Sequence, residues 1–428
     1  NSSNQTNGSG LKLSTEEIVR QAGERYIRFF ADNVSMFAHP YDSALSGLST
    51  SEAEDVELVQ LLLAAAEKVG YQQFDRASRL LAQCEWTASD AGNPVQRLVF
   101  CFAKALQERI DRETGRMMDQ ERGRNEKSSL VLGSNLAFLK CHQEIPFTQV
   151  TQFVGVQAII ENVAVATKVH LIDLQIRSGV QWTILMQALA ERYKYPIRLL
   201  KITAVGTTDK QEMEKTGKRL VSFAESLNLP LLFKLVFLPD MKDLKPELFD
   251  IEADEAVAVY SLTILRAMIS RPHCLENLMR VIRRLNPSIM VVTEVEANHN
   301  SPSFMHRSIE ALFFHAAYFD CFEDCMERDN QCRMILEGIY LRDGIQNMVA
   351  TEGEERITRS VKIDVWRAFF ARFGMLEIEL SESSLYQADL VVKRFACASS
   401  CTLDNNGKCL IVGWKGTPIH SISIWKFS

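Results

Sequence analysis

The pattern of hydrophobic and polar positions divides the chain into a helical first part and a second part in which short strands alternate with helices. In the first part, apolar residues recur every three or four positions, which is the spacing of one face of an α-helix. Two capping boxes and one Asn-Pro pair, which are signals for helix starts, precede these stretches. The three predicted helices begin at the Ser14–Glu17 box, at the Ser51–Glu54 box and at Asn93-Pro94.

From about residue 168 onward, short apolar runs suited to buried strands alternate with segments of helical period. Such alternation favours right-handed crossovers and a mostly parallel sheet. The turn signal at 405–407 predicts a terminal hairpin, which would place antiparallel strands at the sheet edge. The predicted strands are 169–174, 197–205, 231–237, 256–262 and 288–292, with helices at 215–227 and 275–285 and around Trp182. The fold class is therefore α/β with an N-terminal helical layer.

Composition and charge narrow the class of protein. The 428 residues leave room for one large domain or two, and the net charge of −6 excludes the basic surface of a dedicated nucleic-acid binder. Ten dispersed cysteines predict reduced thiols in the cytosol or nucleus. The longest apolar run, 61–66, is too short to span a membrane, and no secretory signal precedes it. We expect a soluble protein whose natural chain extends upstream of Asn1, with a disordered tail at 1–13 and a mobile loop at 112–129.

The loop after the strand 169–174 is the natural place for a nucleotide or S-adenosylmethionine site, because open α/β sheets bind ligands at the carboxyl ends of their strands. A glycine-rich fingerprint needs two or three glycines, and only Gly179 is present. The next strand supplies no acidic residue for ribose hydroxyls before Asp209. We therefore favour a structural role for this loop over cofactor binding.

Polar residues on the predicted strands have both a chemical and a structural interpretation. His170 and Asp173 fall on opposite faces of one strand, so burial with hydrogen-bonded partners is favoured over a catalytic dyad. Glu294 and Glu296 share a face and could serve a metal or acid–base site, but an ion pair with Arg307 is favoured.

The cysteines and one leucine motif also have two interpretations. Two loose cysteine triplets fit zinc spacing poorly, so burial is favoured. The LxxLL pattern at 58–62 fits a partner-recognition motif, but it also fits an ordinary packed helix. The triplets are Cys321, Cys325 and Cys332, and Cys397, Cys401 and Cys409.

Five groups of spaced residues resemble the plant GRAS family of transcription regulators from about residue 55 to the end. The central group resembles the namesake motif of the family and comprises Val169, His170, Leu171, Ile172, Asp173, Gln181 and Trp182. Upstream, residues 88–106 resemble the first leucine-rich region. Downstream, similar residues include Glu294, Glu296, Asn298, Arg307, Arg356, Trp366, Arg367, Trp414 and Trp425.

The chain departs from the family pattern at three places. Gly155-Val156 replaces an Ala-Asn pair that typically precedes Gln-Ala-Ile, and Tyr260 stands where Asn is common. Both departures bear on any ligand or partner contact inferred there. Ile424 replaces Ala in the terminal Ser-Ala-Trp motif, which is an apolar exchange.

The resemblance implies a Rossmann-like core, similar to S-adenosylmethionine-dependent methyltransferases, below an N-terminal helical cap. The implied bounds are a cap at 14–165 and an α/β core at 166–428, together one GRAS domain. The implied function is that of a nuclear transcriptional regulator, without enzymatic activity or cofactor. It would act through other GRAS proteins and DNA-binding transcription factors such as zinc-finger proteins, and would reach DNA indirectly. The gibberellin, root-patterning and symbiosis pathways all stay open.

Two further expectations follow for individual residues. The nearly all-apolar helix at 58–69 is expected to keep one face for a partner after packing, through Leu58, Leu61, Leu62 and Leu63. The family-motif residues are expected to be structural. The competing function is a methyltransferase or small-molecule binder that uses the pocket above 174–179.

Overall fold

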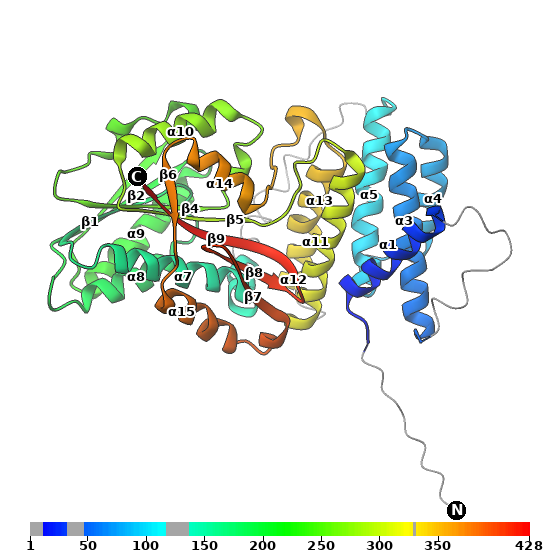
Figure 1. Cartoon of the computed structure of the whole chain (residues 1–428), viewed down its shortest axis with the longest axis horizontal. Coiled ribbons are helices and arrows are strands. Elements are labelled where there is room, and N and C mark those ends of the chain that lie inside the picture. The colour runs from blue at the N-terminus through cyan, green and yellow to red at the C-terminus, as the bar shows by residue number, and fades with distance from the viewer. Residues whose placement is uncertain (1–11, 32–46, 117–136, 328–330) are drawn as a thin grey trace, which may run out of the picture. The chain divides into compact units, whose positions relative to one another are not determined.

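A computed structural model describes residues 12–31, 47–116, 137–327 and 331–428, and these residues form two compact units (Figure 1). The helical unit is formed by the described residues within 1–130 and 303–350, and the sheet unit by those within 131–302 and 351–428. Neither unit is continuous in sequence. The predicted cap and core are continuous, whereas the structure groups 303–350 with the N-terminal helices and 146–162 with the sheet.

The helical unit is built around α3, which packs against α1, α4 and α5, while α11 packs against α1 and α5. Each of these helices buries an apolar face, so the unit has its own core. Its elements are α1 (Thr15–Ala31), α3 (Thr50–Gly70), α4 (Phe74–Thr87), α5 (Pro94–Glu113), α11 (Phe304–Cys325), α12 (Gln331–Ile335), the π-helical η4 (Leu336–Leu341) and α13 (Arg342–Val349).

Helix starts in this unit test the predicted capping signals. The Ser14–Glu17 box and the Asn93 cap before Pro94 are confirmed. The predicted Ser51–Glu54 box is wrong, because α3 begins two residues earlier with a box formed by Ser49 and Glu52. The Glu52 carboxylate also accepts a hydrogen bond of 2.8 Å from the backbone N–H of Leu13. This contact from a distant segment favours the earlier start, and spacing alone could not reveal it.

The sheet unit contains a nine-stranded sheet in the order β3-β2-β1-β4-β5-β9-β8-β7, with β6 paired to β9. The first five strands are parallel and the remaining pairings are antiparallel, which confirms the predicted fold class. The strands are β1 (Lys168–Asp173), β2 (Leu199–Gly206), β3 (Leu231–Phe237), β4 (Ala256–Leu262), β5 (Ile289–Val295), β6 (Met375–Ile378), β7 (Cys401–Asn406), β8 (Cys409–Trp414) and β9 (Thr417–Phe427). The predicted hairpin is the β7–β8 pair.

Helices cover both faces of this sheet (Figure 1). Four helices line one face, α7 (Pro146–Asn162), α8 (Val180–Ala190), α9 (Lys210–Ser226) and α15 (Glu382–Lys393). The other face carries α10 (Pro272–Leu285) and α14 (Ile363–Ala371). Short helical turns connect the elements at η1 (Met241–Asp243), η2 (Pro246–Phe249), η3 (Leu265–Ala267), η5 (Gly353–Glu355) and η6 (Ala398–Ser400).

Two predicted unstructured segments lie largely outside the described residues. The tail 1–13 is described only from residue 12, and the loop 112–129 only as far as residue 116. Its first two residues, Arg112 and Glu113, continue α5. Within the described ranges, no helix combines the length and apolar character needed to cross a membrane.

Candidate functional site

The order of the parallel strands reverses between β1 and β4, and the carboxyl ends of these strands form the expected ligand site of such a sheet. Asp173 and Tyr260 are register partners there. The Asp173 carboxylate accepts hydrogen bonds from the indole N–H of Trp182, at 2.8 Å, and from the backbone N–H of Gln175, at 3.0 Å. The rings of Trp182 and Tyr260 meet edge to face, with centroids 4.8 Å apart. Side chains thus fill this position.

Burial dominates the electrostatics of Asp173. It raises the pKa of the carboxyl to about 6, against the opposing effect of the two hydrogen bonds. Both carboxylate oxygens are engaged within the protein, so the group orients Trp182 on the first turn of α8. This geometry favours a positioning role over proton transfer to a ligand.

Gly179 precedes α8 in the left-handed region, at φ 67°. A Cβ atom at this position would lie 3.0 Å from Thr216 Cγ2 and 3.2 Å from Leu220 Cδ1 of α9. The Thr216 hydroxyl also donates a hydrogen bond of 2.9 Å to the carbonyl of Arg177. The loop therefore packs directly on α9, and helix packing accounts for its single glycine.

The two departures from the family pattern lie together beside this site. A Cβ atom on Gly155 of α7 would lie 3.2 Å from the Tyr260 ring and 3.0 Å from Val291 Cγ1. Tyr260 is fully buried, and its hydroxyl has no hydrogen-bond partner among the described residues. The large ring occupies the space that the missing methyl group of Gly155 leaves.

Glu294 and Glu296 are buried and hydrogen-bonded to backbone donors. Glu294 accepts from the N–H of Leu265 at 2.8 Å, and Glu296 accepts from the N–H of Ile363 at 3.0 Å. Burial raises the pKa of Glu294 to about 7. Arg307 belongs to the helical unit, so its predicted ion pair with these carboxylates stays a prediction. What the structure shows instead is that the carboxylates anchor turns next to β4 and before α14.

His170 lies on the opposite face of β1 from Asp173, as the alternation predicts. Its Nδ1 is 3.1 Å from Glu255 Oε2, and its Nε2 is 2.8 Å from the Thr203 hydroxyl. The Lys201 ammonium lies 3.3 Å from the same Glu255 carboxylate. Burial, with Lys201 nearby, lowers the pKa of His170 to about 4. This network ties β1, β2 and the start of β4 together, and no local sequence pattern predicts it.

The C-terminal motif residues form a packed aromatic and ionic cluster. Trp366 stacks on Phe370, with centroids 5.8 Å apart, and Phe370 contacts Trp425 at 4.7 Å. Arg367 Nε donates to Glu377 at 2.8 Å. α14 is thereby held to β6 and β9.

Most remaining motif residues are buried, and their structural role stays a prediction. Val169, Leu171, Ile172, Gln181, Arg307, Arg356 and Trp414 are buried, whereas Asn298 is exposed.

The α3 leucines bear on the expected partner face. Leu58, Leu62 and Leu63 are buried within the helical unit, and Leu61 is half-buried. α3 has neighbours on several sides, which is why little of its apolar circumference is left over. A partner could reach these three side chains only by displacing a helix, and their partner-binding role stays a prediction.

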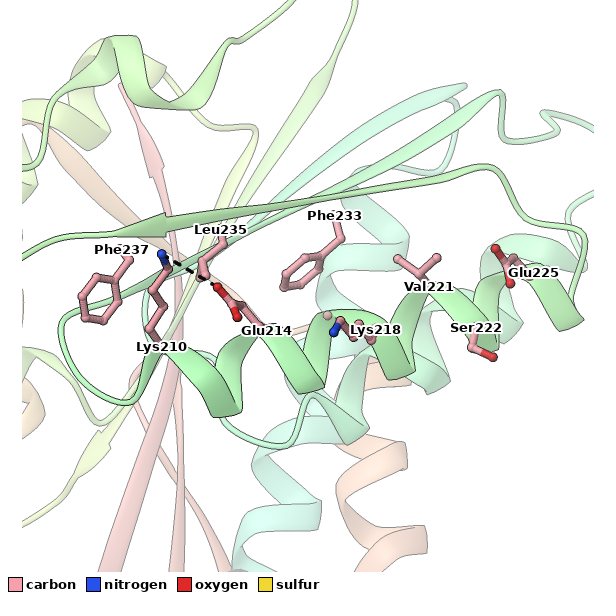
Figure 2. A pocket seen from close by; sticks show the side chains of 10 residues that line it. Lys210, Glu214, Lys218, Val221, Ser222, Glu225, Phe233, Leu235 and Phe237 are labelled. Carbon is pink, nitrogen blue, oxygen red and sulfur yellow. Dashed lines mark ion pairs between the residues drawn. The ribbon is translucent and has the colours of Figure 1, made fainter.

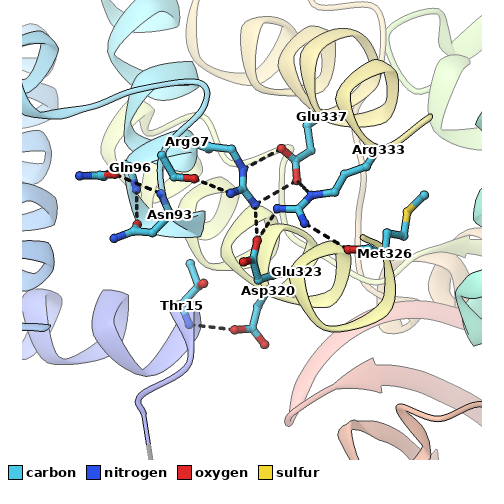
Figure 3. A network of polar contacts seen from close by, with 10 residues as sticks. Thr15, Asn93, Gln96, Arg97, Asp320, Glu323, Met326, Arg333 and Glu337 are labelled. Carbon is cyan, nitrogen blue, oxygen red and sulfur yellow. Dashed lines mark hydrogen bonds and ion pairs between the residues drawn. The ribbon is translucent and has the colours of Figure 1, made fainter. Parts of the chain in front are cut away.

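An ionic cluster in the helical unit was not predicted from the sequence (Figure 3). The Arg97 guanidinium on α5 donates to Glu337 at 2.8 Å and to Glu323 at 2.9 Å. Arg333 donates to the same two carboxylates, with a 3.0 Å bond to Glu337. The cluster joins α5 to α11, α12 and η4, across more than 220 residues of sequence. The family resemblance covered Arg97, but nothing in the sequence linked it to these glutamates.

None of the ten cysteines forms a disulfide bond. Cys321 and Cys325 lie one helical turn apart, with their sulfur atoms separated by 3.9 Å. Among the described residues, no group of three or more His, Cys, Asp or Glu side chains could hold a metal ion.

The strand order and the motif-bearing core define a GRAS-type α/β protein. The chain belongs to the GRAS domain family, whose sequence profile matches residues 58–426. It is 31% identical over 383 residues to the DELLA protein RGL1 of Arabidopsis thaliana, covering 88% of this chain and 71% of that protein. It is 28% identical to the GRAS family protein RAD1 of Medicago truncatula, covering 97% and 81%.

The chain is also similar to a solved structure and to a further relative. The crystal structure of SCL7 in Oryza sativa superposes with a TM-score of 0.76 at 26% identity, over 86% of this chain and 99% of that one. The DELLA protein GAI1 of Vitis vinifera is 28% identical, and the chain spans 63% of its length.

Proposed function

We propose that this protein is a nuclear regulator of plant transcription that acts through protein partners. The proposed partners are other GRAS proteins and DNA-binding transcription factors such as zinc-finger proteins, which bring the protein to promoters. Membership of the GRAS family and similarity to DELLA proteins support this proposal.

One observation carries the proposal beyond family membership. At the carboxyl ends of β1 and β4, Trp182 and Tyr260 pack against each other and both oxygens of Asp173 are engaged. Adenosyl recognition at this position requires room beside the glycine loop and free polar groups. The fold is thus better suited to presenting surfaces than to holding a nucleotide.

The competing function is a methyltransferase or small-molecule binder, which the strand order β3-β2-β1-β4-β5 favours. Titration calorimetry with S-adenosylmethionine distinguishes a regulator that acts through partners from a methyltransferase or small-molecule binder. We expect no binding at 100 μM ligand. Saturable binding that Tyr260→Trp abolishes would contradict the proposal.

The direct test measures partners. The complete natural protein, carrying an affinity tag, is purified from plant nuclei, and each candidate GRAS or zinc-finger partner is then mixed with it pairwise. We expect defined complexes by size-exclusion chromatography with light scattering, and promoter binding only when the DNA-binding partner is present. A protein that stays monomeric with every candidate, or is excluded from nuclei, would contradict the proposal.

A further inference from the structure

β3 forms one edge of the sheet, and its outer backbone groups can be assigned from its pairing with β2. The N–H of Leu200 donates to the carbonyl of Pro230, and the N–H of Leu238 donates to the carbonyl of Gly206. In a parallel ladder, alternate residues face the same neighbour, so the even-numbered residues face β2. The odd-numbered residues therefore direct their N–H and C=O groups to the open edge. These residues are Leu231, Phe233, Leu235 and Phe237.

This edge lacks the usual protection against pairing with another strand. Natural sheets blunt their edges with outward charges, prolines, bulges or very short strands. β3 has seven residues, and its single charged side chain, Lys234, is paired with Asp250. Leu232 is 49% exposed and Phe237 is 39% exposed. Among the described residues no strand pairs with the outward backbone groups of β3, and β3 also offers apolar contact area.

A groove runs between this edge and α9, with a volume of about 730 Å³ (Figure 2). Phe233, Leu235 and Phe237 line it from the strand, and Val221 lines it from the helix. A Cβ atom on Gly217 would lie only 2.3 Å from the Phe233 ring. The ring therefore lies directly on the helix backbone.

The charges on the helical wall of the groove are partly unsatisfied. Lys210 and Glu214 form a long ion pair of 3.8 Å at one end. Lys218 and Glu225 also line the groove, and neither belongs to the ion pairs that α9 forms among the described residues, Lys210–Glu214 and Lys215–Glu212. Lys218 and Glu225 lie two helical turns apart, or about 10 Å. The wall therefore presents one free positive and one free negative charge.

We propose that an extended segment of a partner protein adds to β3 as a further strand. Its alternate apolar side chains lie in the groove and an acidic side chain faces Lys218. An extended backbone can pair with the outward groups of four alternate residues, which a docked helix cannot do. The proposal deepens the proposed function, on which it rests, because the segment belongs to a partner.

Charge complementarity favours such a segment over a second copy of this chain. Two copies of β3 would pair antiparallel about a two-fold axis, with both α9 helices on the same face. Gly217 contacts Phe233 near the middle of the strand, so the neighbouring Lys218 would approach its own symmetry mate. An acidic side chain of a partner segment at the same place would instead be attracted to Lys218.

The test uses a synthetic ten-residue peptide, blocked at both ends, in which threonine alternates with valine or isoleucine and one aspartate takes the central apolar position. Fluorescence anisotropy measures its affinity for the whole chain. Amide hydrogen exchange, resolved by residue, reports the binding mode. We expect saturable binding and slowed exchange at Phe233, Leu235 and Phe237, because their N–H groups become paired.

Three variants of the chain locate the site. Leu235→Pro removes an outward N–H but no bond to β2, and should weaken binding at least tenfold with the fold retained. Lys218→Glu should weaken the aspartate peptide about fivefold and favour a peptide with lysine in that place. Leu232→Ser, on the other face of the same strand, is the matched control and should change affinity less than twofold. If Leu235→Pro fails to fold, the affinities of Lys218→Glu for the aspartate and the lysine peptide still test the proposal.

Three results would overturn the proposal. They are no saturation below 1 mM peptide, binding that leaves the β3 amides unprotected, and a dimer in light scattering that Leu235→Pro dissolves. The last would assign the edge to a second copy. The peptide assay needs no nuclear partner, so its failure alongside intact partner complexes would reject this site and leave the proposed function standing.

Discussion

Tyr260 and Gly155, two positions at which the sequence analysis finds departures from the family pattern, lie against each other in the structure. The Tyr260 ring lies against the α7 backbone at Gly155, where a methyl group would crowd it. The ring also packs on Trp182, whose indole is fixed by Asp173. The two exchanges therefore act as one feature that fills the carboxyl end of β4 with an aromatic side chain.

A double-mutant cycle tests this pairing. Gly155→Ala should gain up to about 1 kcal/mol from helix propensity but lose about 1–3 kcal/mol through overpacking, for no net gain. In a Tyr260→Val background the ring contact is lost while the 3.0 Å approach to Val291 remains, so the same change should cost less than it does beside Tyr260. Urea unfolding measures the coupling, expected at about 0.5–3 kcal/mol. Additive effects would contradict the contact.

Two conservative substitutions separate the polar roles at this site. Tyr260→Phe should leave the free energy of unfolding unchanged or slightly higher, because the buried hydroxyl has no partner among the described residues. Trp182→Phe should cost about 1–3 kcal/mol, because the buried Asp173 loses a donor. Thermal and urea unfolding of both variants check this. An equal loss for both would contradict this assignment, because Tyr260→Phe keeps the ring and removes only the hydroxyl.

The pH dependence of stability should carry a contribution from Glu294. Burial raises its folded-state pKa from the ordinary value of 4.5 to about 7. The folded state binds this proton more tightly, so the contribution is present below pH 4.5 and is lost as pH rises toward 7. Glu294→Gln keeps an acceptor for Leu265 and should flatten this change, by about 3 kcal/mol at most. Urea titrations of the wild type and of Glu294→Gln at pH 5 and pH 8 measure the change in the free energy of unfolding. The same change in both proteins would contradict the contribution of Glu294.

For single residues, the sequence pattern predicted burial but not the hydrogen-bond partners. The alternation of β1 placed His170 and Asp173 on opposite faces, as observed. The partners of His170 could not be foreseen, because Glu255 lies 85 residues away in the chain. Pairing of that kind depends on strand order, which a local pattern does not encode.

The positions of helices and strands were predicted better than the tertiary contacts between them. β3 and β4 were predicted with the bounds that the structure shows, because apolar runs between polar turns mark buried parallel strands. The α3 start was misplaced by two residues, since Ser49 and Ser51 both match the capping pattern. The contact between Glu52 and Leu13 decides between them, and it is tertiary.

The Arg97 cluster should dominate the stability of the helical unit. Arg97→Ala leaves Glu337, whose side chain is 10% exposed, without its closest cation from α5. Breaking such a buried pair costs about 3–5 kcal/mol, and Arg97→Met with Glu337→Leu should recover most of it. Hydrogen exchange of α5 and α11 amides measures the loss. A neutral effect of Arg97→Ala would show that Arg333 alone neutralises both glutamates.

For the whole molecule, the net charge predicts how strongly the protein binds DNA. The net charge is −6, and candidate basic groups such as Arg280, Arg283 and Arg284 on α10 supply three charges at most. Arg280 is already paired with Glu276. Three phosphate contacts give a salt slope of only about −2.7, so weak and non-specific binding is expected. Titration of promoter and scrambled duplexes at 150 mM salt checks this; sub-micromolar, sequence-dependent affinity would contradict it.

The discontinuity of the helical unit has a consequence for synthesis. α5 ends at Glu113, yet α11 and α13 of the same unit are complete only at Val349, 236 residues later. α1, α3, α4 and α5 can pack on one another early, but at about 5–20 residues per second the faces of α1 and α5 that contact α11, and the face of α5 that contacts α13, wait roughly 10 to 50 seconds on the ribosome. Throughout this interval these faces stay open and Arg97 lacks Glu323 and Glu337. The nascent chain is therefore expected to depend on chaperones until the polypeptide has passed residue 350.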